Sequence, residues 1–291
     1  MHYRGRFAPS PTGPLHFGSV VAALASYLDA RRHQGEWLVR IDDIDRLRER
    51  PGSASHILST LERFGMHWDG DVVYQSQRRQ FYQQALEELH ADGLIYGCNC
   101  SRKQVAAVAA PGIEGFIYPG SCRNSNIMQA ESHSLRLRTN NHAIHFDDRI
   151  QGAVVQRIRS EIGDFILRRG DGIISYQLAT AVDDHHQGIT DIVRGEDLLL
   201  SSPRQIFIRQ LLKMPQPDYA HLPLVTNTDG SKLSKSSDAW PVDIKNPVRT
   251  LNQALDFLGQ QQVQAENLEE FWPQAIHNWN IQAVKPASIK P

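Results

Sequence analysis

The chain has 291 residues, of which 31 are Lys or Arg and 32 are Asp or Glu, so its formal net charge is −1. This balance excludes a protein that holds nucleic acid by bulk positive charge, so a polynucleotide partner would need a local basic patch. A hydrophobic content of 41% is typical of a globular protein, and the length favours about two domains. No apolar stretch approaches the ~18 residues of a membrane span, and prolines interrupt the N-terminal segment before any apolar run. We therefore expect a cytoplasmic protein without membrane contact.

The first forty residues predict one βαβ unit. Tyr3–Ala8 reads as a short strand, a turn rich in proline and glycine follows, and a helix is expected over Ser19–Arg32 with Ser19 as its N-cap. Glu36–Ile41 supplies the second strand. Neither G-x-G-x-x-G nor G-x-x-x-x-G-K-[ST] follows the first strand, which excludes the dinucleotide fingerprint and the P-loop. The expected fold class is α/β with a parallel, doubly wound sheet.

The rest of the chain predicts helices and further sheet segments. We expect an amphipathic helix over Gln75–His90, followed by an irregular insert, rich in Cys, Gly and Pro, over Cys98–Arg123. Strands are expected within Leu135–Ile150, sheet-associated segments over Asp164–Leu167 and Ile173–Val182, and a short buried strand over Ile189–Val193. A further helix is expected over Pro247–Leu258. Asn246 is the expected N-cap of that helix. The 3.6-residue period continues over Leu268–Trp279, where Pro273 predicts a kink or a break.

Two short motifs, far apart in the chain, resemble the signatures of one enzyme class. Residues 6–19 read RFAPSPTGPLHFGS and residues 232–236 read KLSKS, which resemble the HIGH and KMSKS signatures of class I aminoacyl-tRNA synthetases. The strings RIDDID at 40–45, VDDH at 182–185 and VRGE at 193–196 are similar to strings of the glutamyl-tRNA synthetase family. Each motif alone is weak, whereas all of them in order are specific.

The resemblance implies a class I, Rossmann-like parallel sheet that is interrupted by an insert. The first half of the catalytic domain would span residues 1–95, and the insert with a Cys-rich zinc site would span residues 96–172. The second half, with the KLSKS loop, would span residues 173–240, and a small helical part would span residues 241–291.

The chemistry of amino-acid activation explains the residue types of the two signatures. A carboxylate attacks the α-phosphorus of ATP and pyrophosphate leaves, so the oxygens that gain charge need cations and N–H donors. His16 would donate to a phosphate, Gly18 would let adenine approach the backbone, and Lys235 would neutralise pyrophosphate. Mg²⁺ would accompany the phosphates. The expected ATP-binding set is His16, Gly18, Ser19, Lys232 and Lys235, with Ser19 standing where the family signature has a second histidine.

Charge matching favours L-glutamate as the amino acid. A guanidinium binds a carboxylate bidentately, and glutamine would leave that guanidinium unpaired in a dry site. Arg6 and Arg194 match the family positions for this contact, whereas Asp42 and Tyr176 match those for the substrate ammonium. The set that the resemblance assigns to glutamate is Arg6, Ala8, Ser10, Asp42, Tyr176 and Arg194. The family usually has Glu where this chain has Asp42, which shortens the side chain by one methylene.

The three cysteines, Cys98, Cys100 and Cys122, lie within 25 residues of one another. Three thiolates with this spacing favour one structural Zn²⁺, which takes four ligands, over three reduced structural cysteines. Physical chemistry alone nominates a His, Asp or Glu as the fourth ligand. The family resemblance assigns that place to Tyr118.

The run Asp183-Asp184-His185-His186 also has the composition of a metal site. Consecutive residues of an extended segment point to opposite faces and rarely share one ion. We therefore expect a polar network at a sheet end, reaching the substrate or the ATP ribose.

Positions 237–291 leave only 55 residues after the KLSKS motif, too few for a further domain of the usual ~100 residues. We therefore expect no anticodon-binding domain. A monomer is a separate expectation, which the residue count does not give. Together with the Cys-x-Cys…Tyr…Cys insert, this pattern resembles truncated members of the glutamyl-tRNA synthetase family. By that resemblance the chain activates L-glutamate with ATP, without needing tRNA, and transfers it to the queuosine in the anticodon loop of tRNA(Asp).

Three alternatives are open at this point. A truncated paralogue would charge the acceptor end of tRNA(Glu). A small-molecule adenylate-forming ligase, such as a pantothenate-synthetase-like enzyme, would share the fold and both signatures without needing Arg6 and Arg194. A non-catalytic RNA-binding module is disfavoured because both His16 and Lys235 are present.

Overall fold

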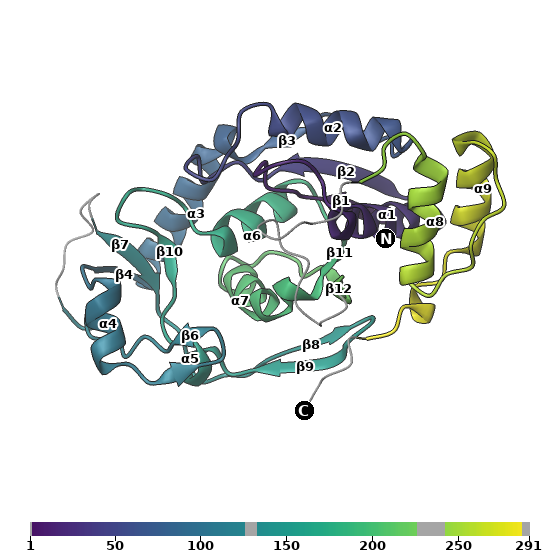
Figure 1. Ribbon diagram of the computed structural model, residues 1–291. Helices are drawn as coiled ribbons and strands as arrows, with labels where there is room; N and C mark the ends of the chain where they lie inside the picture. Colours follow the sequence, from purple (N-terminus) through teal and green to yellow (C-terminus); the bar gives the residue numbers. More distant parts are fainter. Residues whose placement is uncertain (1, 126–132, 226–241, 287–291) are drawn as a thin grey trace.

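The computed structural model describes residues 2–125, 133–225 and 242–286 (Figure 1). The helices in these ranges are α1 (Phe17–Arg32), α2 (Ser53–Arg63), α3 (Arg79–Ala91), α4 (Arg102–Val108), α5 (Ile158–Glu161), α6 (Tyr176–His186), α7 (Ser202–Leu211), α8 (Pro247–Phe257) and α9 (Leu268–Asn278). The strands are β1 (Arg4–Phe7), β2 (Glu36–Ile41), β3 (Val73–Tyr74), β4 (Ile95–Cys98), β5 (Pro111–Gly112), β6 (Gly115–Phe116), β7 (Ser134–Leu137), β8 (Ile144–Asp148), β9 (Gly152–Gln156), β10 (Ile166–Arg168), β11 (Asp191–Gly195) and β12 (Asp218–Leu222). Within the described part of the chain, no helix combines the length and the apolar character that crossing a membrane requires.

The predicted parallel sheet is present and consists of two adjoining groups of strands. β1, β2 and β3 pair in parallel, and β11, β12 and β8 form a second parallel group whose edge strand β9 is antiparallel. The groups meet where the amide of Thr190 donates to the carbonyl of Arg4 at 3.0 Å. The order of strands reverses at this junction, and in open α/β sheets a crevice for ligands forms at such a point, beyond the carboxyl ends of the strands.

Helix α1 follows β1 but begins two residues before the predicted start. His16, not Ser19, is the N-cap, and its Nδ1 accepts a hydrogen bond from the Ser19 amide at 3.3 Å. An imidazole can therefore cap a helix as Ser or Asp does, because one ring nitrogen carries a lone pair. This cap fixes the histidine at the point where the loop from β1 enters the helix.

The segment between β3 and α6 holds a small separate sheet. β4, β7 and β10 pair antiparallel, and the predicted irregular insert contains helix α4 and the β5–β6 hairpin. Ser101 caps α4 with a capping box, since its hydroxyl accepts from the Gln104 amide while the Gln104 side chain accepts from the Ser101 amide. Figure 1 shows this sheet and α4 at one end of the molecule, away from α8 and α9.

The sequence prediction for the segment that leads into α6 is wrong. The segment Ile173–Val182 was expected to be sheet-associated, but from Tyr176 on it is helix α6, because the Ser175 hydroxyl accepts from the Leu178 amide and starts the helix. Of the kink or break that Pro273 predicts, the break is absent, since α9 is continuous over Leu268–Asn278. The first helix of this C-terminal pair, α8, begins after Asn246 with Pro247 in its first turn, as predicted.

The apolar core has two main parts. One part joins α1, β1, β2 and α2 to α8 and α9, and the other joins α3, β4 and β7 to α6 and α7. Nearly every residue of α1 from Val20 to Ala30 is buried, because helices or strands pack on all its sides. The loop that leads from β1 into α1 is thus held between two rigid elements.

Candidate active site

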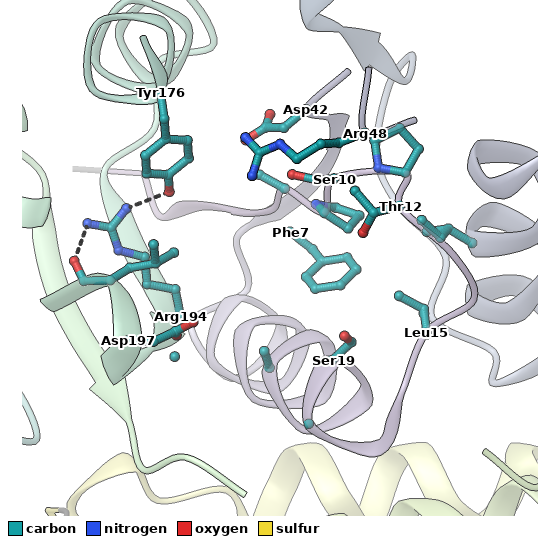
Figure 2. A pocket seen from close by; sticks show the side chains of 18 of the residues that line it. Phe7, Ser10, Thr12, Leu15, Ser19, Asp42, Arg48, Tyr176, Arg194 and Asp197 are labelled. Carbon is teal, nitrogen blue, oxygen red and sulfur yellow. Dashed lines mark hydrogen bonds between the residues drawn. The ribbon is translucent and has the colours of Figure 1, made fainter. Parts of the chain in front are cut away.

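A cavity of about 510 Å³ lies at the carboxyl ends of β1 and β11. Its wall combines the loop from β1 into α1, the start of α6, the end of β11 and the segment after β12 (Figure 2). The structure brings together in this wall most of the predicted site residues: Arg6, Ala8, Ser10, His16, Gly18, Ser19, Asp42, Tyr176 and Arg194. Lys232 and Lys235 lie outside the described residues.

The His16 end of the cavity is built by the first turn of α1. Because Nδ1 of His16 accepts from the Ser19 amide, the proton of a neutral ring is on Nε2. A Cβ at Gly18 would lie 3.2 Å from two atoms of this ring. The glycine therefore keeps room for the His16 imidazole, a role that sequence reasoning did not foresee.

Four arginines line the cavity, and two of them, Arg6 and Arg194, are buried, with exposed fractions of only 3% and 5%. The Nε of Arg6 donates to Oδ1 of Asp184 at 3.3 Å. The Nη1 of Arg194 donates to the hydroxyl of Tyr176 at 3.3 Å. Two desolvated guanidiniums on one wall attract an anionic group.

Asp42 also lines the cavity, apart from Arg194 in Figure 2, and it is not a free carboxylate. Its Oδ1 accepts from Nε of Arg40 at 2.8 Å, and the same guanidinium donates to Oδ1 of Asp184 at 2.6 Å. Burial raises the pKa of Asp42 to about 6, because the attraction of Arg40 only partly compensates for lost hydration and for the charges of Asp183 and Asp184. An anion held at this cost is suited to bind a cation.

The carboxylates Asp183 and Asp184 form a buried polar network, as predicted, but not on an extended segment. They lie in the last turns of α6, where consecutive side chains point about 100° apart. Asp183 accepts from Gln75, Arg78 and Tyr82, whereas Asp184 accepts from Arg6 and Arg40. The guanidiniums of Arg6 and Arg40 hold the pKa of Asp184 well below its usual range despite its burial. The network therefore stands behind the cavity wall and fixes Arg6 and Asp42 relative to each other.

Several residues that build the site were missed by sequence reasoning. Arg40 lies inside the recognised string at 40–45, but only the fold shows that it joins Asp42 to Asp184. His221 and Asp148 lie behind Arg194, and they come from strands β12 and β8, far from Arg194 in the chain. No motif or spacing connects these residues, so they had no signal in the sequence.

The three cysteines converge at the end of β4 in the small antiparallel sheet. Their Sγ atoms all lie within 4.8 Å of one another, and in the described ranges no His, Asp or Glu joins this group. The Tyr118 hydroxyl lies 3.3 Å from Sγ of Cys98 and 3.6 Å from Sγ of Cys100. Sulfur ligands at about 2.3 Å from a common zinc ion would lie about as far from one another as these Sγ atoms do, so the donor set fits a tetrahedral zinc site.

The surroundings of the cysteines favour a thiolate at Cys98. Burial raises the pKa of this thiol, but hydrogen bonds from Tyr118 and from Nε of Arg136, the latter at 3.2 Å, outweigh it and lower the pKa overall. For Cys100, burial and the neighbouring thiols raise the pKa to about 11. A bound divalent cation would deprotonate such thiols, since it is the largest local charge.

The sequence and the fold can now be compared with known proteins. Over residues 2–273 the chain matches the family described as tRNA synthetases class I (E and Q), catalytic domain. The cavity at the reversal point of the sheet is therefore that of a class I tRNA synthetase catalytic domain. The Glutamyl-Q tRNA(Asp) synthetase of Chromobacterium violaceum is 49% identical over 289 residues, which cover 99% of this chain and 97% of the relative. That of Dechloromonas aromatica is 48% identical over 292 residues, with the same coverage. The chain belongs to the glutamyl-Q tRNA(Asp) synthetase family, and it is a ligase.

Solved structures lead to the same class. A glutamate tRNA ligase from Elizabethkingia meningosepticum, in complex with its amino acid, matches with a TM-score of 0.79 and 25% identity over 98% of this chain. A glutamate-tRNA synthetase from Elizabethkingia anophelis matches with a TM-score of 0.78 and 25% identity. The chain spans only 66% and 67% of these two proteins. The predicted α/β fold class and the resemblance to class I synthetases are confirmed.

Proposed function

We propose that the chain activates L-glutamate with ATP, without tRNA, and then transfers the glutamate to the queuosine of tRNA(Asp). The observation that carries this proposal is the set of charges in the cavity: the buried guanidiniums of Arg6 and Arg194, the Tyr176 hydroxyl bonded to Arg194, and the buried carboxylate of Asp42 all line it. Glutamate has a carboxylate at one end and an ammonium with a second carboxylate at the other. The names of the relatives from Chromobacterium violaceum and Dechloromonas aromatica support the transfer to tRNA(Asp).

In the proposed mechanism the side-chain carboxylate of glutamate lies against Arg6 and Arg194, and the ammonium lies against Asp42. Tyr176, which the family resemblance assigns to the ammonium, is placed with the carboxylate instead, because its hydroxyl oxygen accepts from Nη1 of Arg194. Ala8 and Ser10, in the loop after β1, line the same wall. This orientation leaves the α-carboxylate directed toward the N-terminus of α1, where the helix dipole favours phosphate oxygens. Fixing both ends of the substrate reduces the entropy that has to be lost in the reaction.

The first step forms a bond between an α-carboxylate oxygen and the α-phosphorus of ATP and breaks the bond to the bridging oxygen, so that pyrophosphate leaves. His16, Gly18 and Ser19 line the ATP side, and we assign the neutralisation of pyrophosphate to Lys232 and Lys235. Mg²⁺ would supply further positive charge on the phosphates. In the second step a hydroxyl oxygen of queuosine bonds to the glutamyl carbonyl carbon, and the bond from this carbon to the phosphate oxygen of AMP breaks. AMP leaves with the electron pair, and the hydroxyl proton passes to solvent.

We further propose that Cys98, Cys100, Cys122 and Tyr118 hold one structural zinc ion. The ion would join β4 to the turn at residues 118–122 and so replace a hydrophobic core in this small part of the molecule. Residues 96–172 would then act as an insert between residues 1–95 and 173–240 of the catalytic domain, with residues 241–291 as a helical appendage.

The test is pyrophosphate exchange with each amino acid in the absence of RNA, followed by transfer of radiolabelled glutamate to tRNA fractions with and without queuosine. Exchange with glutamate and transfer only to queuosine-bearing tRNA(Asp) are the expected results. Transfer to the acceptor end of tRNA(Glu) would show a conventional synthetase paralogue instead. Arg194→Lys should reduce kcat/KM for glutamate about hundredfold, since an ammonium cannot replace the guanidinium contacts. Arg32→Lys, at the exposed C-terminal end of α1, should have no effect.

A further inference from the structure

Arg194 lies in a cradle of buried hydrogen-bond acceptors. Its Nε donates to Nε2 of His221 at 3.1 Å, and its Nη2 donates to Oγ of Ser202 at 2.8 Å and to Oε1 of Gln205 at 2.9 Å. The three acceptor side chains are at most 1% exposed. These contacts fix the orientation of the guanidinium plane and the directions of its N–H groups.

The chemistry of the contacts determines the state of His221. A guanidinium can only donate, so Nε2 of His221 must offer its lone pair, and the ring proton is on Nδ1. Nδ1 lies 2.6 Å from Oδ2 of Asp148, which in turn accepts from the amides of Ile150 and Gln151 through Oδ1. Burial and the charge of Arg194 lower the pKa of His221 to about 4, although Asp148 opposes this shift. The ring is therefore neutral at neutral pH, and one tautomer persists.

The order Ser202–His221–Asp148 is also that of a hydrolase triad, since Oγ of Ser202 lies 3.0 Å from Nε2 of His221. Ser202 is fully buried, however, and its oxygen accepts from Arg194. No substrate can reach such a hydroxyl. The series therefore serves Arg194 rather than a nucleophile.

A count of the N–H groups shows what remains for a ligand. Of the five N–H groups of a guanidinium, the one on Nε and both on Nη2 are used within the cradle of Arg194. Only Nη1 is left to face the cavity, and it donates to the Tyr176 hydroxyl as well. Because the Tyr176 oxygen accepts from Arg194, the hydroxyl proton of Tyr176 points away from the guanidinium and is available to the cavity that Tyr176 lines.

We propose that His221, Ser202 and Gln205 are positioning residues that give Arg194 and Tyr176 a face made only of hydrogen-bond donors, and that this face selects glutamate over glutamine. The inference rests on the proposed function. A carboxylate offers two oxygens that accept, whereas the amide of glutamine would direct an N–H₂ group at Nη1 and the hydroxyl. Donors that face donors in a desolvated site stay unpaired, and the amide substrate loses affinity for that reason. A guanidinium free to rotate would lose this discrimination.

The experiment compares kcat and KM for glutamate and for glutamine in pyrophosphate exchange by Gln205→Met, His221→Leu and His221→Gln. Gln205→Met and His221→Leu each remove one acceptor of Arg194, whereas His221→Gln restores an acceptor near the position of Nε2. Gln260→Met is the matched control, because Gln260 is also buried but bonds the carbonyls of Leu258 and Asn280. A thermal melt of each variant measures its stability.

For Gln205→Met and His221→Leu we expect the KM for glutamate to rise about tenfold, with a much smaller change in kcat, because the contact is at the side-chain end of the substrate. The preference for glutamate over glutamine should fall by a similar factor. His221→Gln should keep the preference for glutamate. Gln260→Met should lower the melting temperature but leave that preference unchanged. If His221→Leu does not fold, Gln205→Met and Ser202→Ala decide the question.

Folded variants with an unchanged preference would overturn the cradle while leaving the proposed function intact. The cradle would also be overturned if Gln260→Met lost as much of the preference for glutamate over glutamine as the cradle variants do, because general destabilisation would then be the cause. If glutamate supports no pyrophosphate exchange by the wild-type enzyme, the proposed function fails and the cradle inference fails with it.

Discussion

Gly163 offers a direct test of how the position of Tyr118 depends on the backbone beside it. Gly163 has a φ of +80°, and an added Cβ would lie 2.5 Å from the carbonyl oxygen and 2.8 Å from the amide nitrogen of Tyr118. Both contacts are with backbone, so no flexible side chain can move aside. In Gly163→Ala the Tyr118 carbonyl must therefore retreat by about 0.9 Å, from 2.5 Å to the 3.4 Å of ordinary contact.

The size of the effect follows from two contributions. A left-handed conformation costs an alanine about 1 kcal/mol, and overpacking against a fixed backbone adds about 1–3 kcal/mol. The shift also strains the bond from the Tyr118 amide to the carbonyl of Ile162, at 3.2 Å, and the one from the Cys122 amide to the Tyr118 hydroxyl, at 3.0 Å. Gly152→Ala is the matched control, because Gly152 has a φ of +79° and an added Cβ would have no atom within 4 Å.

Urea unfolding in excess zinc and a chelator competition for zinc measure the two consequences. Gly163→Ala should lose about 2–4 kcal/mol of unfolding free energy and about tenfold or more in zinc affinity. Gly152→Ala should lose only about 1 kcal/mol and keep its zinc affinity. Equal losses in the two variants would refute the reasoning, because conformational strain alone would then explain them.

Three other outcomes are expected. Asp29 is buried and accepts hydrogen bonds from Tyr3, Arg149 and Trp279. Asp29→Ala should therefore lower the unfolding free energy by about 3 kcal/mol in urea titrations. The control Asp69→Ala should lower it by less than about 1 kcal/mol, because Asp69 is half-exposed. Burial raises the pKa of Asp42 to about 6, so kcat/KM for glutamate should fall as the pH drops below about 6, and Asp42→Asn should lack this limb of the profile. Burial lowers the pKa of His221 to about 4, so the unfolded chain binds more protons between pH 6.5 and 4. Relative to His221→Gln, the wild type should therefore lose about 3 kcal/mol of stability across that interval.

Much of the fold and of the site was accessible from the sequence because local signals were strong. The strand at Glu36–Ile41 and the helix after Asn246 follow from apolar periodicity and from the cap. The clustering of Cys98, Cys100 and Cys122 follows from their spacing, and the structure places their sulfur atoms together. The resemblance to known signatures also selected residues that converge on one cavity.

Other features depend on contacts that no local pattern encodes. The segment Ile173–Val182 was expected to be sheet-associated, but Ser175 starts a helix and the core around α6 completes it. The sequence could not show which N–H groups of Arg194 are bonded within the protein and which face the cavity. Its partners His221 and Ser202 are brought near it only by the pairing of β11 with β12 and by α7.

The covering of α1 has a consequence for the order in which the chain can fold. The helix emerges early in synthesis, but it packs against α8 and α9, which follow it by roughly two hundred residues. Trp279, near the end of the described chain, donates to Asp29 within the same helix at 2.9 Å. A nascent chain therefore carries an uncovered apolar helix through most of translation. We expect it to engage chaperones until α8 and α9 have left the ribosome.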